Sequence, residues 1–160
     1  MKEHLQKAIF AAGCFWGVEE KFFHTSGVES TQVGYTGGKL ENPSYEKVSS
    51  GNTGHTEAVE ITFDPHKISY GKLLDIFWKI HDPTTLNRQG PDVGSNYRSA
   101  IFYVDDEQKE IAEKSKERME KTGLIQERIV TEITKAGKFY PAEEYHQKYF
   151  LKNPNHGCPI

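Results

Sequence analysis

The sequence predicts an α+β fold, a single two-layer domain with helices packed on a mixed β-sheet and with long functional loops. Three observations support this. Short apolar or alternating segments, typical of strands, are interspersed with amphipathic segments, typical of helices. The 160 residues suit one domain and leave no room for two full ones. Hydrophobic residues make up 36% of the chain, which is enough for a core and excludes intrinsic disorder.

The first third of the chain alternates strands and a helix. Residues 7–12 are apolar and predict a short buried strand that Gly13 stops. Residues 14–25 follow as a helix, because their aromatic and apolar residues recur at helical spacing. Residues 28–35 are predicted as a second strand. The glycine-rich stretch 34–54 is expected to be a long loop with one helical turn.

The middle of the chain adds a strand, a helix and a second loop. Residues 57–63 alternate, so that every second side chain faces one side of a strand. Residues 69–81 predict an amphipathic helix from the spacing of their leucines and aromatics. Residues 82–96 hold prolines and glycines and predict the second long loop. Long polar loops on a compact scaffold are where a functional site is expected.

The last third predicts two strands and two helices. Residues 97–104 form a predicted strand, and residues 105–122 form a charged surface helix with an aspartate cap. Residues 128–135 are predicted as another strand, and residues 141–151 as a short last helix. The chain therefore mixes about five strands with three or four helices, as the α+β prediction requires.

We expect a catalytic domain over residues 1–151 and a flexible tail over residues 152–160 that carries Cys158. The net charge of −3 gives no indication of a nucleic-acid or membrane partner. Two cysteines exclude a disulfide-rich scaffold and a four-cysteine zinc site. The residues before Cys14 could pass for a lipoprotein cleavage box, but the apolar stretch after Lys7 is too short for a signal peptide.

Cys14 follows a predicted strand and opens a predicted helix. The N–H groups and the positive dipole end of a helix N-terminus stabilise a thiolate, so Cys14 is a candidate nucleophile. The alternative is a small, buried and inert apolar residue. Glu57 lies on the apolar face of its strand, where partial desolvation would raise its pKa and make it a candidate general acid. Here the alternative is a frayed strand end that leaves Glu57 in water.

At this point the motifs resemble a known family, the A-type peptide methionine sulfoxide reductases. The resemblance covers nearly the whole chain and its blocks occur in the family's order. These blocks are Gly13-Cys14-Phe15-Trp16-Gly17, Gly34-Tyr35-Thr36-Gly37-Gly38, Asn42-Pro43-Ser44-Tyr45, Thr53-Gly54-His55-Thr56-Glu57, His81-Asp82-Pro83-Thr84, Tyr97-Arg98-Ser99 and Tyr145-His146-Gln147.

The resemblance implies a reaction and roles for four residues. The family reduces the S epimer of methionine sulfoxide, free or in proteins, and Cys14 would attack the sulfoxide sulfur. Glu57 would protonate the sulfoxide oxygen, while Tyr45 and Tyr97 would donate hydrogen bonds to it. These residue types suit the chemistry, because a sulfoxide oxygen leaves only when it is protonated, and phenols stabilise it without adding charge.

The resemblance also implies the surroundings of the substrate. Phe15 and Trp16 would form the apolar pocket for the methyl group, and Asp92 would complete the polar network. Aromatic walls suit a methyl thioether and would exclude water. Taken alone, Phe15 and Trp16 could equally be core aromatics. His146 lies in a resembling block and could contact the site, although a single histidine on a helix is commonly structural.

Cys158 would resolve the sulfenic acid that forms on Cys14, which gives a disulfide that thioredoxin or a small dithiol reduces. The alternative is a tail thiol without a role. Many relatives have Gly-Tyr before this cysteine where this chain has His156-Gly157, and many carry a further cysteine beyond it. Because the chain ends at Ile160, we expect no relay through two tail cysteines. Asn96, where relatives often have Gln, is a milder change.

Two other functions compete with this interpretation. A thiol hydrolase or transferase would pair Cys14 with a histidine base, and a peptide-binding module would carry an inert Cys14. The candidate histidines are His55, His81, His146 and His156, which lack metal-ligand spacing. Neither function explains why the cysteine, the glutamate and both tyrosines match together. We expect a cytoplasmic monomer without metal or cofactor, with an external thiol as reductant and no nucleic-acid or membrane partner.

Overall fold

The computed structural model of the chain describes residues 4–123 and 127–153. The strands are β1 (Gln6–Ala12), β2 (Val28–Thr36), β3 (Thr56–Phe63), β4 (Arg88–Gln89), β5 (Asp92–Val93), β6 (Ser99–Tyr103), β7 (Glu132–Lys135) and β8 (Tyr140–Pro141). The helices are α1 (Phe15–Phe23), α2 (Tyr45–Ser49), α3 (Tyr70–Lys79), α4 (Asp106–Lys121) and α5 (Tyr149–Lys152), with short 3-10 helices η1 (Ser95–Tyr97) and η2 (Glu144–His146).

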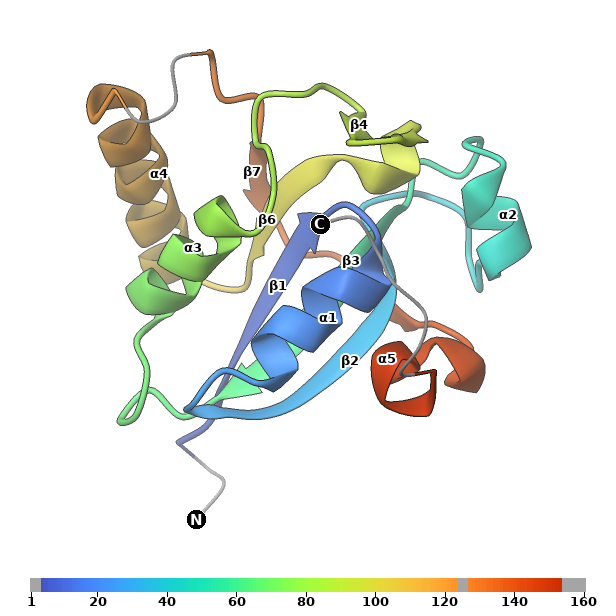
Figure 1. Cartoon of the computed structure of the whole chain (residues 1–160), viewed down its shortest axis with the longest axis horizontal. Helices are drawn as coiled ribbons and strands as arrows, with labels where there is room; N and C mark the ends of the chain where they lie inside the picture. The colour runs from blue at the N-terminus through green and yellow to red at the C-terminus, as the bar shows by residue number, and fades with distance from the viewer. Residues whose placement is uncertain (1–3, 124–126, 154–160) are drawn as a thin grey trace.

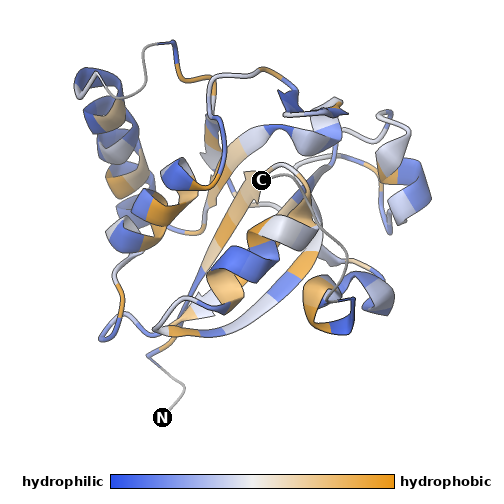
Figure 2. Cartoon of the chain, viewed as in Figure 1, coloured by the Kyte–Doolittle hydropathy of each residue, from blue (hydrophilic) through white to orange (hydrophobic). Residues whose placement is uncertain are grey.

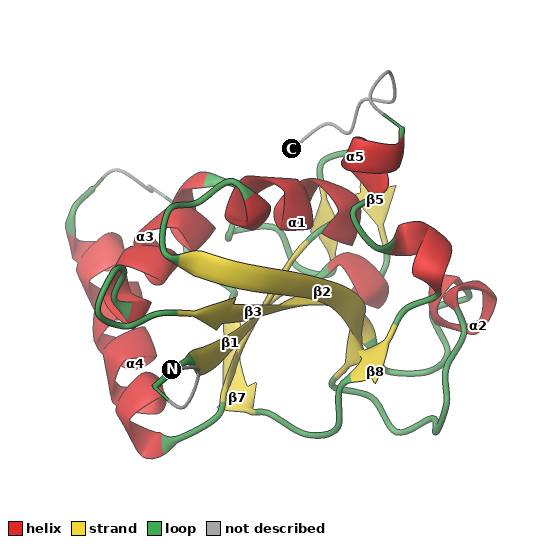
Figure 3. Ribbon diagram, turned by 90° about the horizontal axis from the view of Figure 1, so that it is seen from below, coloured by secondary structure: helices red, strands yellow, loops and turns green. Residues whose placement is uncertain are grey.

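The main sheet has six strands in the order β7-β6-β1-β3-β2-β8. Strands β6 and β7 run parallel, whereas the other neighbouring pairs are antiparallel. Figure 1 shows the helices α1 and α3 in front of this sheet, and Figure 3 shows them on one side of it. The predicted α+β class, with helices on a mixed sheet, is therefore confirmed.

The core lies between the helices and one face of the sheet. The ring of Phe10 in the central strand β1 packs on Phe22 of α1 at 5.5 Å and on Phe77 of α3 at 5.1 Å, measured between ring centroids. Figure 2 shows β1 as a mainly apolar strand, and both of its faces are buried from Ala8 to Ala12. Ile9 and Ala11 of β1 face the other side of the sheet, where they form a second, smaller apolar cluster with residues that include Phe102.

A segment that joins β7 to β8 covers this second face. The two strands lie at opposite edges of the sheet, so the chain between them must cross it (Figure 3). Ala136 and Phe139 of this segment pack against the second cluster. The crossing brings the end of the chain to β2, where β8 pairs with Gly34 and Tyr35.

The helix starts follow the capping residues in the sequence. The side chain of Ser69 accepts a hydrogen bond from the N–H of Lys72 at 3.1 Å and caps α3. Asp105 caps α4 in the same way through the N–H of Gln108 at 2.8 Å. The predicted helices over 69–81 and 105–122 are thus confirmed, each a little shorter than expected.

The predicted helix over residues 141–151 is wrong. Its first residue, Pro141, belongs to strand β8, and a 3-10 turn and the short helix α5 replace the rest. Between them Lys148 adopts the left-handed conformation, with φ of 53°, which breaks any continuous helix. The predicted strand over 128–135 begins only at Glu132, and the predicted loop over 82–96 contains the hairpin β4–β5.

The predicted tail over residues 152–160 falls almost wholly outside the described residues. Lys152 is described as the last residue of α5, and Asn153 follows it as the C-cap. Cys158 lies outside the described residues. The division into a domain and a tail, and the role of Cys158, stay predictions.

Candidate active site

Cys14 lies at the N-cap of α1, directly after β1 and Gly13. Gly13 has φ of 101°, a conformation that side chains disfavour, and a Cβ there would meet Cγ of Gln89 at 2.7 Å. Glycine therefore lets the chain turn from strand to helix while the hairpin β4–β5 packs against the turn. The structure confirms the predicted place of Cys14 at a strand–helix junction, where its side chain is partly exposed. That exposure argues against the inert core interpretation.

Glu57 is buried, with a residue exposure of 1%. It lies inside β3, and the frayed strand end considered above is wrong. The backbone N–H of Phe15 donates a hydrogen bond to Oε1 of Glu57 at 3.1 Å, across 42 positions of sequence. This bond brings the carboxyl group to the first turn of α1, one residue beyond Cys14.

Tyr97 lies within electrostatic range of the other candidate residues. Burial raises its pKa, and the nearby charge of Glu57 raises it further. Tyr45, Asp92 and Cys14 contribute in the same direction. A phenol with a raised pKa stays neutral at physiological pH and can donate its proton in a hydrogen bond.

Tyr45 opens helix α2 on another side of the site. Burial raises its pKa, and the charge of Glu57 adds to this, while hydrogen-bonding contacts with Ser49 and Tyr97 act in the opposite direction. Cys14 is again among the groups in range. The structure thus brings together the cysteine, the glutamate and both tyrosines that the sequence singled out.

Aromatic side chains wall one side of the site. Phe15 is buried, and its ring packs on Tyr35 at 5.7 Å. Trp16 is partly exposed, and its ring stacks on Tyr149 at 3.8 Å with an angle of 6° between the planes. Trp16 therefore lies at the edge of the core, where its ring packs on Tyr149 of the C-terminal segment.

His146 connects this wall to Tyr45. Its ring lies 5.2 Å from Phe15, 5.7 Å from Trp16 and 4.5 Å from Tyr45. Its Nδ1 accepts a hydrogen bond from Nε1 of Trp16 at 2.9 Å. Burial lowers the pKa of His146, although the charge of Glu143 acts in the opposite direction, so the imidazole is neutral at pH 7.

The bond from Trp16 determines which nitrogen of His146 carries the proton. Indole N–H can only donate, so Nδ1 is the acceptor and the neutral ring carries its proton on Nε2. Nε2 is buried and has no hydrogen-bond partner among the described residues. A buried donor without a partner is costly and commonly marks a functional position. His146 therefore lies against three of the predicted site residues, Phe15, Trp16 and Tyr45.

Two other histidines have structural roles. Nδ1 of His55 accepts the N–H of Gly38 at 3.0 Å, and its Nε2 lies 2.7 Å from the carbonyl oxygen of Leu40. His81 lies between the carbonyl oxygen of Phe77 and the hydroxyl of Ser99, both at 2.7 Å. Both ring nitrogens of each histidine are engaged in holding loops and helix ends.

Bonds from two side chains hold η1, which ends in Tyr97, against the start of β3. The hydroxyl of Thr56 donates to the carbonyl oxygen of Asn96 at 3.0 Å. The guanidinium of Arg98 donates to the carbonyl oxygens of Ser95 at 2.9 Å and Gly54 at 3.1 Å. The strand of Glu57 and the turn of Tyr97 are therefore tied together.

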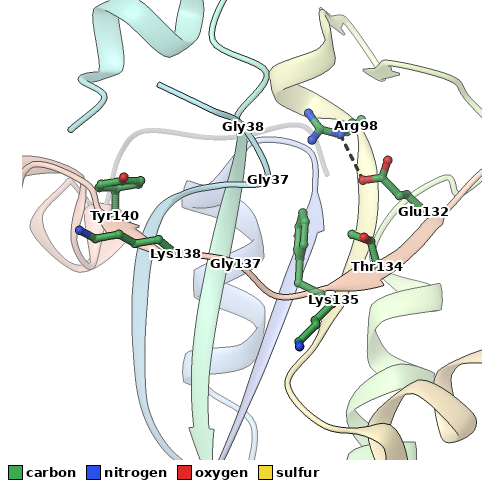
Figure 4. A pocket seen from close by; sticks show the side chains of 10 residues that line it. Gly37, Gly38, Arg98, Glu132, Thr134, Lys135, Gly137, Lys138 and Tyr140 are labelled. Atoms are coloured by element: carbon green, nitrogen blue, oxygen red, sulfur yellow. Dashed lines mark ion pairs between the residues drawn. The ribbon is translucent and has the colours of Figure 1, made fainter. Parts of the chain in front are cut away.

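A polar pocket lined in part by Arg98 contains none of the candidate catalytic or substrate-binding residues. It opens next to the segment that follows β7, and Figure 4 shows the pair between Arg98 and Glu132, at 3.7 Å, on its wall. The lining residues are Gly37, Gly38, Arg98, Phe102, Glu132, Thr134, Lys135, Gly137, Lys138 and Tyr140. In Figure 4 the amino groups of Lys135 and Lys138 point away from each other, so they do not converge on one ligand.

The sequence patterns did not predict that Glu143 and Tyr149, near the C-terminal end of the described residues, contact the site residues. Glu143 accepts hydrogen bonds from Tyr35 and Tyr45, and Tyr149 stacks on Trp16. Their position in the predicted last helix gave no indication of these contacts. The block around His146 was the one signal in this region.

Within residues 4–123 and 127–153, no group of three or more histidine, cysteine, aspartate or glutamate side chains is arranged to hold a metal ion. No helix in the described part of the chain is long and apolar enough to cross a membrane.

Comparison with known proteins identifies the family. The family model of peptide methionine sulfoxide reductase matches residues 6–160. A peptide methionine sulfoxide reductase of Methanothermobacter thermautotrophicus is 61% identical over 153 residues, which is 96% of this chain and 90% of the relative. Methionine sulfoxide reductase A of Corynebacterium diphtheriae has a similar structure, with a TM-score of 0.87, 38% identity, and coverage of 99% of this chain and 81% of that chain.

Reduced Mxr1 from Saccharomyces cerevisiae superimposes with a TM-score of 0.91 at 37% identity, over 98% of this chain and 90% of that chain. These matches span nearly all of the described residues, including the part of the chain in which the N–H of Phe15 joins Glu57 to the start of α1. The chain belongs to the peptide methionine sulfoxide reductase family, whose reaction is the reduction of methionine sulfoxide to methionine.

Proposed function

We propose that the chain reduces the S epimer of methionine sulfoxide, free or in proteins, with Cys14 as nucleophile and Glu57 as general acid. The observation that carries the proposal is the bond from the N–H of Phe15 to Oε1 of Glu57 at 3.1 Å. It holds an acid of 1% exposure at the first turn of the helix that Cys14 caps.

In the first step the Cys14 thiolate attacks the sulfoxide sulfur. Glu57 gives its proton to the oxygen, and the resulting hydroxyl group passes from the substrate sulfur to the sulfur of Cys14 while the transient bond between the two sulfur atoms breaks, which leaves Cys14 as a sulfenic acid. The substrate sulfur gains the two electrons that Cys14 loses, so methionine leaves and no metal or organic cofactor is needed. Tyr45 and Tyr97 donate hydrogen bonds to the oxygen while its charge changes.

The substrate is held by the aromatic wall and the polar groups around it. Phe15 and Trp16 contact the methyl group, and Asp92 orders the polar side of the site. The buried Nε2–H of His146 is available to a substrate acceptor, which would give this donor the partner that it lacks among the described residues.

In the second step Cys158 attacks the sulfenic acid, which forms a disulfide with Cys14 and releases water. A thioredoxin-type dithiol then reduces the disulfide. A solved structure of Mxr1 from Saccharomyces cerevisiae in complex with Trx2, with 24% identity and a TM-score of 0.66 to this chain, supports the choice of a thioredoxin as partner. We expect the enzyme to work as a monomer in the cytoplasm, where thiol reductants are abundant.

The test is a single turnover without reductant. The reduced protein is mixed with excess methionine S-sulfoxide, and methionine and thiols are counted over time. We expect one methionine per protein and the loss of both thiols, while the R epimer yields none. Methionine formed from neither epimer would refute the reductase proposal, and a burst of product from an activated ester would support a thiol hydrolase instead.

A further inference from the structure

Glu143 joins three separate parts of the fold through one carboxyl group. Its Oε1 accepts a hydrogen bond from the hydroxyl of Tyr35 at 2.8 Å, and its Oε2 accepts one from the backbone N–H of Tyr45 at 3.0 Å. Tyr35 belongs to β2, Tyr45 opens α2, and Glu143 follows β8. The two bonds span 108 and 98 positions of sequence, so the contact is set by the tertiary fold.

The backbone around Glu143 is itself held in place. Strand β8 pairs with β2, and the N–H of Ala142 donates to the carbonyl oxygen of Val33 at 2.9 Å. The side chain of Gln147 then accepts the N–H of Val33 at 3.0 Å and donates to its carbonyl oxygen at 2.9 Å. A carboxyl between these two anchors has a defined position relative to the sheet.

Tyr45 lies at the end of a long loop and needs such an anchor. As the first residue of α2 it has an N–H that no carbonyl of its own helix can accept. Glu143 accepts it. The phenol of Tyr45 lies against His146, with the ring centroids 4.5 Å apart, and within electrostatic range of Glu57 and Cys14. A shift of the backbone at Tyr45 would therefore move this phenol relative to the reacting groups.

The other arm fixes the carboxyl group. Tyr35 is fully buried, and its ring packs on Phe15, the residue next to Cys14. A hydroxyl in this position has little freedom, so its bond to Oε1 orients Glu143 and leaves Oε2 for Tyr45. The arrangement requires a side chain long enough to reach both partners at once.

We propose that Glu143 is a positioning residue for the reduction step, which holds the backbone of Tyr45 so that its phenol faces the sulfoxide oxygen. The proposal rests on the role assigned to Tyr45 in the proposed function. Glu143 does not touch the substrate. Its contribution is the geometry of Tyr45, and a misplacement on the order of 1 Å in such a group can slow a reaction by roughly 100-fold.

Two substitutions of Glu143 test separately whether the length or the negative charge of its side chain matters. Glu143→Asp keeps the negative charge but is one methylene shorter, so it cannot bridge Tyr35 and Tyr45. Glu143→Gln loses the charge but keeps the length, because its amide oxygen can accept the N–H of Tyr45 and its amide nitrogen can donate to the oxygen of Tyr35. We expect Glu143→Asp to slow single-turnover methionine release roughly 10- to 100-fold, and Glu143→Gln to stay within a few-fold of wild type.

The same measurement in a Tyr45→Phe background tests whether Glu143 acts through Tyr45. We expect Glu143→Asp to add little further slowing there, because the phenol that it positions is gone. A merely structural role would lower the melting temperature and the fraction of active sites, yet leave the rate constant per active site unchanged. Tyr35→Phe, which removes one arm, is the matched control and should slow the step less than Glu143→Asp.

The outcomes keep this inference distinct from the proposed function. A wild type that releases no methionine, or a Tyr45→Phe variant as fast as wild type, would refute the proposed function. If the wild type is active, three results would overturn the inference about Glu143. Glu143→Asp could be as fast as wild type, or Glu143→Gln could be slower than Glu143→Asp. The third such result is that Glu143→Asp slows the step as much in the Tyr45→Phe background as in the wild type.

Discussion

The backbone N–H of Phe15 donates a hydrogen bond to Oε1 of Glu57 at 3.1 Å. The bond joins the first residue of α1 to a buried acid of β3, and it places the acid beside the thiol that caps the helix. A neutral carboxyl can keep this bond through its carbonyl oxygen and still hold a proton on the other oxygen. The arrangement therefore suits a residue that must remain an acid until the substrate arrives.

Substitution Glu57→Gln tests the acid. The amide oxygen can still accept the N–H of Phe15, so the local structure should persist, but the amide has no proton to transfer. We expect single-turnover methionine release to slow by roughly 10²–10⁴-fold, the usual size of a general-acid effect. Substrate affinity should change much less. A rate within a few-fold of wild type at neutral pH would remove Glu57 as the acid.

The pH dependence of single-turnover methionine release should be set by the protonation of Cys14 and Glu57. Release should need Cys14 deprotonated and Glu57 protonated, so the wild-type rate should rise with pH and then fall. In Glu57→Gln the falling limb that Glu57 causes should be missing. A variant profile that only scales down the wild-type curve would assign that limb to another group.

The two cysteines should fail in different ways. Cys14→Ser should abolish methionine formation, because the nucleophile is lost. Cys158→Ser should still complete one turnover and then stop with thioredoxin as reductant, whereas a small dithiol should restore turnover by attacking the sulfenic acid directly. Normal thioredoxin-dependent turnover by Cys158→Ser would show that this cysteine has no resolving role.

Trp16 should contribute to substrate binding through its ring and through its N–H. Trp16→Ala removes both the aromatic wall and the bond to His146, which should lower kcat/KM by the equivalent of about 1–3 kcal/mol. Trp16→Phe keeps an aromatic ring and should lose less. Circular dichroism and melting curves serve as controls, and a variant that unfolds before assay would instead make Trp16 a core residue.

Sequence patterns were informative where contacts are local. The apolar run of β1, the aspartate cap of α4, the amphipathic helix α3 and the alternation in β3 each depend on near neighbours, and the structure confirms them. The same alternation placed Glu57 on the apolar face of its strand but left its burial open, and the structure decides for burial. Periodicity alone is sufficient for elements that bury one face against the rest of the chain.

Sequence patterns failed where distant partners decide the conformation. Pro141 pairs with Gly34, and the N–H and amino group of Lys148 both bond to Glu19, 129 positions away. These contacts break the predicted last helix, and no local pattern shows them. For the same reason Glu143 and Tyr149 went unnoticed as parts of the site, whereas His146 was noticed because its block resembles the family.

Gly38 should be intolerant of any side chain. A Cβ there would lie 2.3 Å from the backbone nitrogen of His55 and 2.5 Å from the carbonyl oxygen of Thr53, so the backbone would have to move. We expect Gly38→Ala to destabilise the fold by about 1–3 kcal/mol in urea unfolding. The matched control is Gly71→Ala in α3, where the nearest atom is Oγ of Ser69 at 3.8 Å and alanine should stabilise by about 0.5–1 kcal/mol. Equal effects would contradict the steric argument.

His81 should make the stability of the fold depend on pH. Burial lowers its pKa from 6.5 to about 4, although the bond to the carbonyl oxygen of Phe77 and the charge of Asp82 act in the opposite direction. Below pH 6.5 the unfolded chain binds a proton at His81 that the folded chain refuses, so protonation favours unfolding. The stability present above pH 6.5 should therefore fall as pH decreases towards 4, by an amount on the order of 3 kcal/mol from this residue.

His81→Gln isolates this contribution from the other groups that titrate in the same range, among them His146. The variant cannot protonate, and its amide oxygen can still accept a hydrogen bond from Ser99. Urea unfolding at intervals between pH 4 and pH 7 should give a flatter curve for the variant, so that the stability gap between the proteins narrows or reverses at low pH. Parallel curves would mean that the folded protein accepts a proton at His81 as readily as the unfolded chain does, and that the closed pair of bonds to Phe77 and Ser99 opens at little cost.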